Sequence, residues 1–340
     1  ALAGDWDGTA LTPDTLYDVI SDFTIPLGQT MTVPSGVTFR VHGRNTDILV
    51  DGQLLVQGTV SAPVLFTSGD QYLNAGDWQG ITFSANTSGH NLDHAHIEWA
   101  SSGVKVLSGS DITITNSIVE DGTFGINVDN ATADIQSSTI QNNSYGVRIY
   151  QTSTVSLTNA NTIMGNNYGI YVYGRQVLGQ DPMPTVSNNN IYDNTTYNYY
   201  ANRFANAASI TLDATNNWWG TTDPVAIANK IFDNTENASW SPIVAFEPML
   251  SAAAVPGNQP ANIPPTANAG IDQSVNEGDV VNLNGAASSD SDGSIVIYSW
   301  QHISGPAITL INATSANASF TAPPVSAATN ITLQLTVTDD

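Results

Sequence analysis

The sequence predicts an all-β chain whose larger part is a parallel β-helix, and three repeated features carry this prediction. Glycines recur at Gly103, Gly125, Gly146 and Gly169, at spacings of 22, 21 and 23 residues. An alternating apolar pair follows each glycine, which indicates a strand. An isoleucine precedes each glycine at a similar offset. A repeat of about 20 to 50 residues is typical of a solenoid, so one coil holds two or three strands separated by turns. The apolar pairs are Val104 and Val106, Ile126 and Val128, Val147 and Ile149, and Ile170 and Val172, and the isoleucines are Ile97, Ile118, Ile140 and Ile163.

The turns of this repeat are rich in Asn and Asp. Three residues after the isoleucine of successive coils stand Asp121, Asn143, Asn166 and Asn194. These residue types tolerate left-handed backbone and bond to neighbouring amides. Stacked at about 4.8 Å from coil to coil, they are expected to form a structural ladder of hydrogen bonds along one corner, rather than a ligand site.

Looser alternation from residue 30 to residue 83 places the start of the solenoid near residue 25. Residues 1–24 are then an N-terminal cap, with a short helix from Thr12-Pro13 through Ile20. A second short helix is expected after Asp223-Pro224, with a pattern that runs through Ile227 and Ile231. Such caps cover solenoid ends, because an uncovered strand edge invites pairing with another chain.

Four segments carry a family resemblance: VPSGVTF at 33–39, GQLLVQG at 52–58, WQGITF at 78–83 and NWWGTTDP at 217–224. With them the chain resembles bacterial right-handed β-helix surface proteins, which implies a right-handed parallel β-helix over residues 25–250. That architecture hosts lyases, glycosidases, esterases, adhesins and inert stalks, so the function must be argued from a site.

Residues 251–263 are rich in Ala, Pro and Asn and are interpreted as a linker. Residues 264–340 resemble a PKD domain, an immunoglobulin-like β-sandwich, through PPTANAG at 264–270, SDSDGSI at 289–295 and the Tyr298-Ser-Trp300 segment. Trp300 is expected in its core. The family pattern has one more strand after residue 340. Either the sequence is a fragment, or a neighbouring copy donates that strand and filaments form.

The acidic turn of this domain suggests a calcium site. Asp290 and Asp292 flank a tight turn at Gly293, so their carboxylates can converge on one hard cation. The PKD resemblance implies that Asn262 and Asp339 complete a Ca²⁺ site. The alternative is a solvated turn that binds no ion.

Charge and composition restrict the partners. The chain has 7 Lys and Arg against 30 Asp and Glu, a formal charge of −23, which argues against nucleic acid and anionic membranes as partners. There is no cysteine, and no apolar run approaches the length of a membrane span, so direct membrane insertion is not expected. The Ala1-Leu-Ala3 start has the small-residue pattern of a signal-peptidase site, which favours a secreted protein, extracellular or on the cell surface.

Two clusters are candidates for chemistry. His94, His96 and Glu98 alternate along one expected strand, so all three would share a face that could hold Zn²⁺, although such a face is commonly only polar exterior. Glu120, Asp121 and Asp129 are the mid-solenoid acids that lie close together in sequence. The basic residues are scattered, and the catalytic residue set of polygalacturonases is missing. No residue pattern therefore indicates a polysaccharide lyase or glycoside hydrolase, which are the enzyme classes to expect if the protein is catalytic.

Tyrosines crowd the last coils, where the repeat lengthens to 28 residues. Insertions into a solenoid usually form binding loops on one face. A shelf of Tyr168, Tyr171, Tyr173 and Tyr192 beside Arg175 could bind neutral sugars, although tyrosine also suits an outward strand position structurally.

Two functions follow. The leading one is a non-catalytic extracellular surface, adhesion or matrix protein, whose partners are a surface polymer or copies of itself in filaments built by strand donation. The alternative is a secreted carbohydrate-active enzyme or glycan-binding module that acts on polysaccharide.

Overall fold

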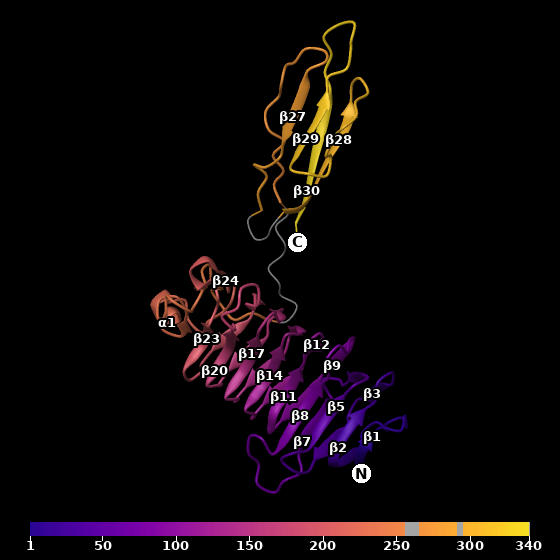
Figure 1. The fold of residues 1–340 in the computed structure, drawn as a ribbon, viewed down its shortest axis with the longest axis vertical. Helices are drawn as coiled ribbons and strands as arrows, with labels where there is room; N and C mark the ends of the chain where they lie inside the picture. Colours follow the sequence, from indigo (N-terminus) through magenta and orange to yellow (C-terminus); the bar gives the residue numbers. More distant parts are fainter. Residues whose placement is uncertain (256–264, 291–294, 340) are drawn as a thin grey trace. The chain divides into compact units, whose positions relative to one another are not determined.

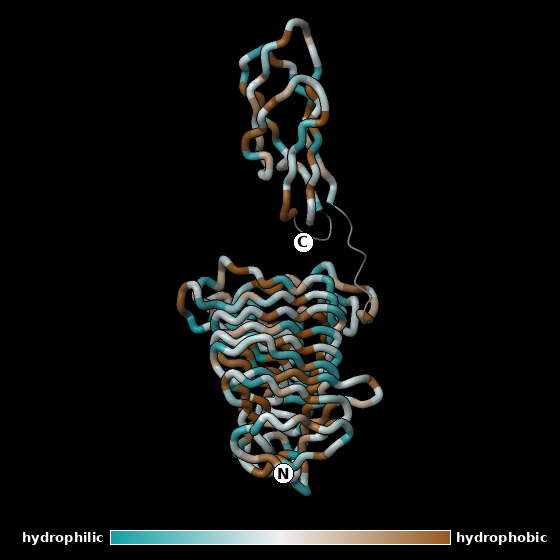
Figure 2. The backbone as a smooth tube through the Cα atoms, turned by 90° about the vertical axis from the view of Figure 1, so that its right-hand side faces the viewer, coloured by the Kyte–Doolittle hydropathy of each residue, from teal (hydrophilic) through white to brown (hydrophobic). Residues whose placement is uncertain are grey.

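The computed structural model describes residues 1–255, 265–290 and 295–339, and the chain forms two compact units, Ala1–Gln259 and Pro260–Asp340 (Figure 1). The first unit is a right-handed parallel β-helix, as predicted. Its strands stack from coil to coil and form three faces, here called face 1, face 2 and face 3. Figure 2 shows the successive coils as parallel layers of the backbone.

Faces 1 and 2 are joined by one long strand of the first coil, β2 (Leu16–Ile25), against which β1 (Leu2–Asp5) also pairs. Face 1 contains β4 (Thr38–Val41), β7 (Val64–Ser68), β10 (Ala95–Glu98), β13 (Ile118–Glu120), β16 (Thr139–Gln141), β19 (Thr162–Met164) and β22 (Asn190–Tyr192). Face 2 contains β5 (Asp47–Val50), β8 (Trp78–Phe83), β11 (Ala100–Val106), β14 (Phe124–Asp129), β17 (Tyr145–Tyr150), β20 (Tyr168–Tyr173), β23 (Tyr197–Asn202) and β25 (Ile231–Phe232).

Face 3 is a separate sheet of seven parallel strands. It contains β3 (Thr30–Pro34), β6 (Gln53–Gln57), β9 (His90–Asp93), β12 (Asp111–Thr115), β15 (Thr132–Gln136), β18 (Thr154–Thr158) and β21 (Thr185–Val186). Beyond it, β24 (Thr211–Asp213) pairs with β26 (Ile243–Ala245). On all three faces alternate side chains point inward, and apolar residues fill the centre of the coils.

The repeated glycines allow the backbone to pack tightly at one corner. A Cβ on Gly125 would lie 2.6 Å from the carbonyl oxygen of Gly146, and a Cβ on Gly146 would lie 2.6 Å from that of Gly169. Beside them runs the predicted ladder. The backbone N–H of Asn143 donates to Asn166 Oδ1 at 2.9 Å, and that of Asn166 donates to Asn194 Oδ1 at 3.1 Å. The ladder prediction is therefore confirmed for these three buried residues.

The prediction was wrong for Asp121. Gly122 takes the ladder position in that coil, and its N–H donates to Asn143 Oδ1 at 3.0 Å. The register differs because Val119 points into the core while Ile118 points outward and is 36% exposed. Asp121 instead turns the corner with a left-handed φ of 56°.

A second buried ladder at another corner was not foreseen. Ser138 N–H donates to Asn161 Oδ1 at 3.0 Å, Asn161 Nδ2 donates to Asn189 Oδ1 at 2.9 Å, and Asn189 N–H donates to Asn217 Oδ1 at 2.9 Å. These bonds satisfy polar groups that the turns carry into the interior, where an unpaired group is costly. Both ladders tie each coil to the next.

The predicted N-terminal helix is wrong, because residues 16–25 form β2 as part of the first coil. Val19, Phe23 and Ile25 point into the core. The first half of β2 pairs with β4 and the second half pairs with β5, so the strand turns a corner and loses strict alternation. The helical spacing of Leu16, Tyr17 and Ile20 was misleading, because Leu16 and Ile20 are 48% and 58% exposed and do not form a buried face. The solenoid begins within the region predicted as a cap.

The predicted C-terminal helix is confirmed as α1 (Pro224–Ala228), which is shorter than its sequence pattern. Asp223 caps its N-terminus by accepting a hydrogen bond from the Val225 N–H. Ile227 packs into the core, whereas Ile231 already belongs to strand β25. Among the described residues, none of the helices has the length and apolar character needed to cross a membrane.

His90, on the inner side of β9, is a buried titratable group of the solenoid. The side chain is 2% exposed, its Nδ1 accepts the Leu54 N–H at 3.3 Å, and its ring lies 4.6 Å from that of Phe83. Burial lowers the pKa of the His90 imidazole to about 4, against the opposing effect of Asp111. The folded state therefore binds fewer protons than the unfolded chain, and its stability falls as the pH drops from about 6.5 to 4.

We expect the free energy of unfolding to decrease by about 2 kcal/mol over that pH range through His90. Urea unfolding at pH 7, 5.5 and 4 measures this. His90→Gln keeps an acceptor but does not titrate, so the variant should lack this part of the pH dependence. An identical pH dependence in both proteins would contradict the assignment.

The described residues of the second unit form two antiparallel strand pairs. β27 (Val280–Asn284) pairs with β29 (Asn317–Thr321), and β28 (Ile295–Ser304) pairs with β30 (Thr332–Asp339). Trp300 on β28 is 4% exposed and lies in the core of this unit, as predicted.

Candidate functional site

Outward-pointing aromatic rings cover the last coils of face 2. The rings come from strands β14, β17, β20 and β23, which follow one another along the solenoid (Figure 1), and from β25, which pairs with β23. Parallel in-register pairing brings equivalent positions of neighbouring coils together, so a ring in one coil meets a ring in the next. We call this set the aromatic surface; its members are Phe124, Tyr145, Tyr150, Tyr168, Tyr171, Tyr173, Tyr197, Tyr200 and Phe232.

Within the aromatic surface the rings form columns along the solenoid. Tyr145 and Tyr168 stack with centroids 5.1 Å apart and planes 6° apart. In the neighbouring column Tyr171 and Tyr200 stack at 4.7 Å and 2°, and Tyr200 stacks on Phe232 at 4.5 Å. Rings of the two columns meet edge to face, as Tyr145 and Tyr171 do. Since stacked neighbours cover the ring faces, the surface offers ring edges and phenol hydroxyls to solvent.

Two arginines lie against these rings. The Arg148 guanidinium is 4.9 Å from the centroid of the Tyr150 ring, and its Nη1 donates to Asn127 Oδ1 at 3.0 Å. Arg203 Nη1 donates to the Tyr173 hydroxyl at 3.1 Å. Burial raises the pKa of Tyr171, and the neighbouring Tyr200 adds to this effect, so the phenol keeps its proton and remains a hydrogen-bond donor.

Three of the five residues predicted to bind glycan lie in the aromatic surface: Tyr168, Tyr171 and Tyr173. Arg175 follows β20, and its Nη1 donates to Gln151 Oε1 at 3.0 Å. Tyr192 lies outward on β22 of face 1, where it pairs with Met164, so the structure separates it from the other tyrosines.

Several members of the surface were not foreseen, although a sequence signal existed. Phe124 and Tyr145 precede the repeat glycines Gly125 and Gly146, as Tyr168 precedes Gly169. Alignment of the coils on their glycines would have shown one aromatic column.

The histidine cluster on face 1 contains different residues from those predicted. The prediction that His94 shares a face with His96 and Glu98 is wrong. His94 has a left-handed φ of 51° and turns the corner between β9 and β10, where its Nδ1 lies 2.9 Å from Asp93 Oδ1. Glu120, from the next coil, takes its place beside His96, with His96 Nε2 2.7 Å from Glu120 Oε1.

The three mid-solenoid acids do not form one group. Glu120 points outward from face 1, whereas Asp129 lies on face 2 and accepts a hydrogen bond from Gln151 Nε2 at 2.6 Å. Asp121 is at the corner after β13, where burial and the Glu120 carboxylate raise its pKa.

The predicted calcium ligands are only partly described. Asn262 and Asp292 lie outside the described residues, while Asp290 is the last described residue before position 295. The backbone of Asp339 on β30 pairs with Ile295. The Ca²⁺ site remains a prediction.

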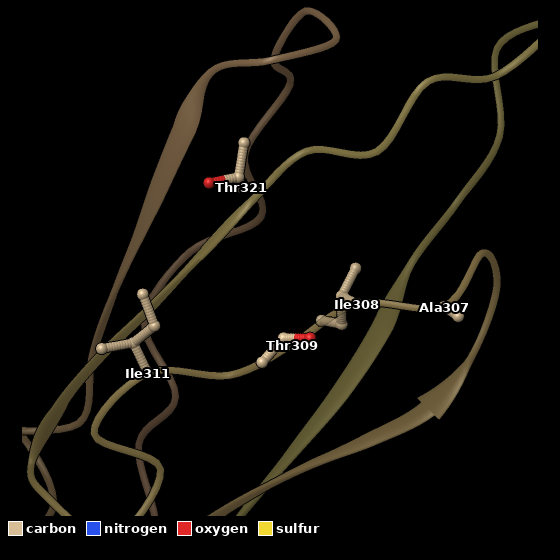
Figure 3. A pocket seen from close by; sticks show the side chains of 5 residues that line it. All are labelled: Ala307, Ile308, Thr309, Ile311 and Thr321. Carbon is tan, nitrogen blue, oxygen red and sulfur yellow. The ribbon is translucent and has the colours of Figure 1, made fainter.

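A hollow in the second unit is lined by small and apolar side chains, shown in Figure 3, and none of the described residues that line it is titratable. The lining residues are Ala307, Ile308, Thr309, Ile311 and Thr321.

Comparison with family models agrees with these two units. Residues 79–240 match the right handed beta helix region, residues 6–101 match the pectate-lyase like beta helix domain, and residues 269–340 match a PKD domain. The chain is thus similar to right-handed β-helix regions over residues 6–240 and to a PKD domain over residues 269–340. The match over 6–101 includes β2, in agreement with its place in the first coil. Searches of curated proteins and of solved structures gave no match.

Proposed function

We propose that this β-helix protein is a non-catalytic extracellular surface protein that adheres to a neutral polysaccharide through its aromatic surface. The observation that carries the proposal is the aromatic surface itself. Nine aromatic side chains point outward from consecutive coils of one sheet, and all are partly exposed. The matched families fit a surface or carbohydrate-related protein.

The arrangement of the rings determines how a sugar chain would bind. Ring faces are covered by neighbouring rings, so flat stacking of a sugar on a ring is not the main contact. Phenol hydroxyls and apolar ring edges recur at the coil spacing of about 4.8 Å, and a polymer that runs along the solenoid meets several of them. Each of these contacts is weak, but the polymer as a whole binds tightly when many of its sugars contact the surface at the same time.

Charge favours a neutral polymer over an acidic one. The formal charge of −23 repels uronates and sulfated sugars. Arg148 and Arg203, the two arginines that contact the aromatic rings, are already engaged with protein groups. An uncharged polymer rich in hydroxyls is not repelled by the negative charge of the protein. Its binding also does not require either arginine to give up its hydrogen bond.

The chemistry beside the aromatic surface supports binding without turnover. Of the described strands that carry the rings, only β14 contains a carboxylate, Asp129, and it accepts a hydrogen bond from Gln151. A glycoside hydrolase needs two carboxyl groups about 5 to 9.5 Å apart around the sugar. Glu98 and Glu120 are paired on face 1 instead. Asp233 and Glu236, which follow β25, both accept a hydrogen bond from the Thr235 hydroxyl, at 2.8 and 2.9 Å.

The double variant Tyr171→Ala/Tyr200→Ala tests the proposal. It removes the central stacked pair, and we expect retention on insoluble neutral polysaccharide to fall at least about tenfold, which corresponds to about 1.4 kcal/mol. Pull-down isotherms on a panel of neutral and acidic polymers measure the retention.

Tyr192→Ala is the matched control, because Tyr192 is an outward strand tyrosine on a different face. Tyr145→Phe/Tyr168→Phe keeps the stack and removes two hydroxyls, so it separates hydrogen bonding from ring contact. Retention equal to wild type in the Tyr171→Ala/Tyr200→Ala variant, with unchanged thermal unfolding, would contradict the proposal.

A further inference from the structure

Face 1 carries a cluster of three ligand-capable side chains that the proposed function does not use. His96 and Glu98 project outward from β10, and Glu120 projects outward from β13 in the next coil. The ligand atoms of these side chains all lie within 4.8 Å of one another. His96 Nε2 is 2.7 Å from Glu120 Oε1 and 3.6 Å from Glu98 Oε2. One imidazole nitrogen and two carboxylate oxygens therefore converge on one point.

Neighbouring coils hold both carboxylates in this orientation. The Thr67 hydroxyl on β7 donates to Glu98 Oε1 at 2.5 Å, and Gln141 Nε2 on β16 donates to Glu120 Oε2 at 2.6 Å. Each glutamate thus has one oxygen fixed by a neutral donor and the other turned toward His96. Outer partners of this kind orient the ligands of a metal site.

The charges of the cluster favour a bound cation. Glu98 and Glu120 are direct partners in the parallel register, where like charges destabilise a sheet. Both side chains are largely shielded, with 20% and 15% exposed. Among the described residues, His96 is the one basic side chain in ion-pair contact with either carboxylate. Arg40, farther along the same outward column, is bound to Asp18 at 2.7 Å.

We propose that His96, Glu98 and Glu120 form a binding site for a divalent transition-metal ion, with Zn²⁺ as the best fit. Zn²⁺ accepts imidazole nitrogen together with carboxylate oxygen in a four-coordinate arrangement, and three protein ligands leave one position for water. Ca²⁺ takes about six to eight oxygen ligands, which this donor set does not supply.

Isothermal titration of the full chain with ZnCl₂ tests the site. We expect one Zn²⁺ per chain at this cluster. Glu98→Gln/Glu120→Gln, which keeps the side-chain size and removes the like-charge repulsion, should weaken Zn²⁺ binding by about 100-fold or more. Gln141→Leu removes only an outer partner and should weaken it about tenfold. Co²⁺ gives a second readout, because its visible absorption reports tetrahedral coordination and should disappear in His96→Gln.

His42→Gln is the matched control. His42 is also an outward histidine beside a carboxylate, with Nε2 2.8 Å from Asp18 Oδ1, but that carboxylate is shared with Arg40. This variant should bind Zn²⁺ as tightly as wild type. Absence of Zn²⁺ binding to the wild-type chain would overturn the proposal. So would equal affinity in Glu98→Gln/Glu120→Gln, or a wild-type preference for Ca²⁺ over Zn²⁺ that this variant abolishes.

Discussion

Asn166→Leu is expected to destabilise the solenoid by about 3 to 5 kcal/mol, because Asn166 is fully buried and both polar atoms of its side chain are hydrogen-bonded. Its Nδ2 donates to Ile140 O at 3.0 Å, to Met164 O at 3.1 Å and to Asn194 Oδ1 at 3.0 Å. Its Oδ1 accepts from the N–H and from Nδ2 of Asn143. Leucine has a similar size but leaves these groups without partners in the core.

Urea unfolding followed by circular dichroism measures the loss. Asn167→Ala is the control, since Asn167 is the next residue in the chain, of the same type, and exposed. We expect that variant to lie within about 0.5 kcal/mol of wild type. A loss below about 1 kcal/mol for Asn166→Leu would show that the ladder does not hold the coils together.

Gly80→Ala is expected to cost about 4 kcal/mol or more and to prevent folding of the solenoid at about 37 °C. Gly80 has a φ of 127°, a conformation essentially restricted to glycine. A Cβ at this position would lie 1.6 Å from the carbonyl oxygen of Ser102 in the next coil. Backbone cannot move away there without breaking the pairing of β8 with β11.

Gly76→Ala separates the steric clash of an added Cβ from the cost of placing alanine at a positive φ. Gly76 also has a positive φ, 85°, but a Cβ there meets no atom within 4 Å. This variant should lose only about 1 kcal/mol. Soluble yield and thermal unfolding of both variants measure the difference. Equal behaviour of the two would show that the coils at β8 are less tightly packed than the structure indicates.

The fold was predictable from the sequence because stacking repeats the same constraint in every coil. Close stacking of successive coils requires the same residue type at equivalent positions, and the spacing of these residues alone revealed it. The positions are the glycines at 125, 146 and 169 and the buried Asn143, Asn166 and Asn194. Register within a coil was harder. Ile118 and Val119 are both β-branched and apolar, so the pattern did not show which of them faces the core.

The bends of the chain between faces of the solenoid were the other reason for wrong predictions. β2 turns between two faces, and the residues whose spacing predicted a helix include Leu16 and Ile20, which are exposed. The left-handed φ of His94 likewise reverses the alternation that had placed it beside His96. Strand periodicity carries no information about where a strand bends.

The candidate sites depend on contacts between coils, which a single strand cannot reveal. Glu120 joins His96 from the next coil, 24 residues away in sequence. Tyr168 and Tyr171 were predicted from local crowding, whereas Phe232 joins them because β25 pairs with β23. Side chains that meet in this way become visible only once the register of the coils is known.

The central claim is that the protein binds a neutral polysaccharide without cleaving it. The most direct test incubates the purified protein with a panel of neutral and acidic polysaccharides and measures both retention and the release of reducing or unsaturated ends. We predict retention on at least one neutral polymer, lost in Tyr171→Ala/Tyr200→Ala, with no release of ends. Release of ends from any polymer would contradict a non-catalytic function, and Glu120→Gln would then show whether face 1 carries the reaction.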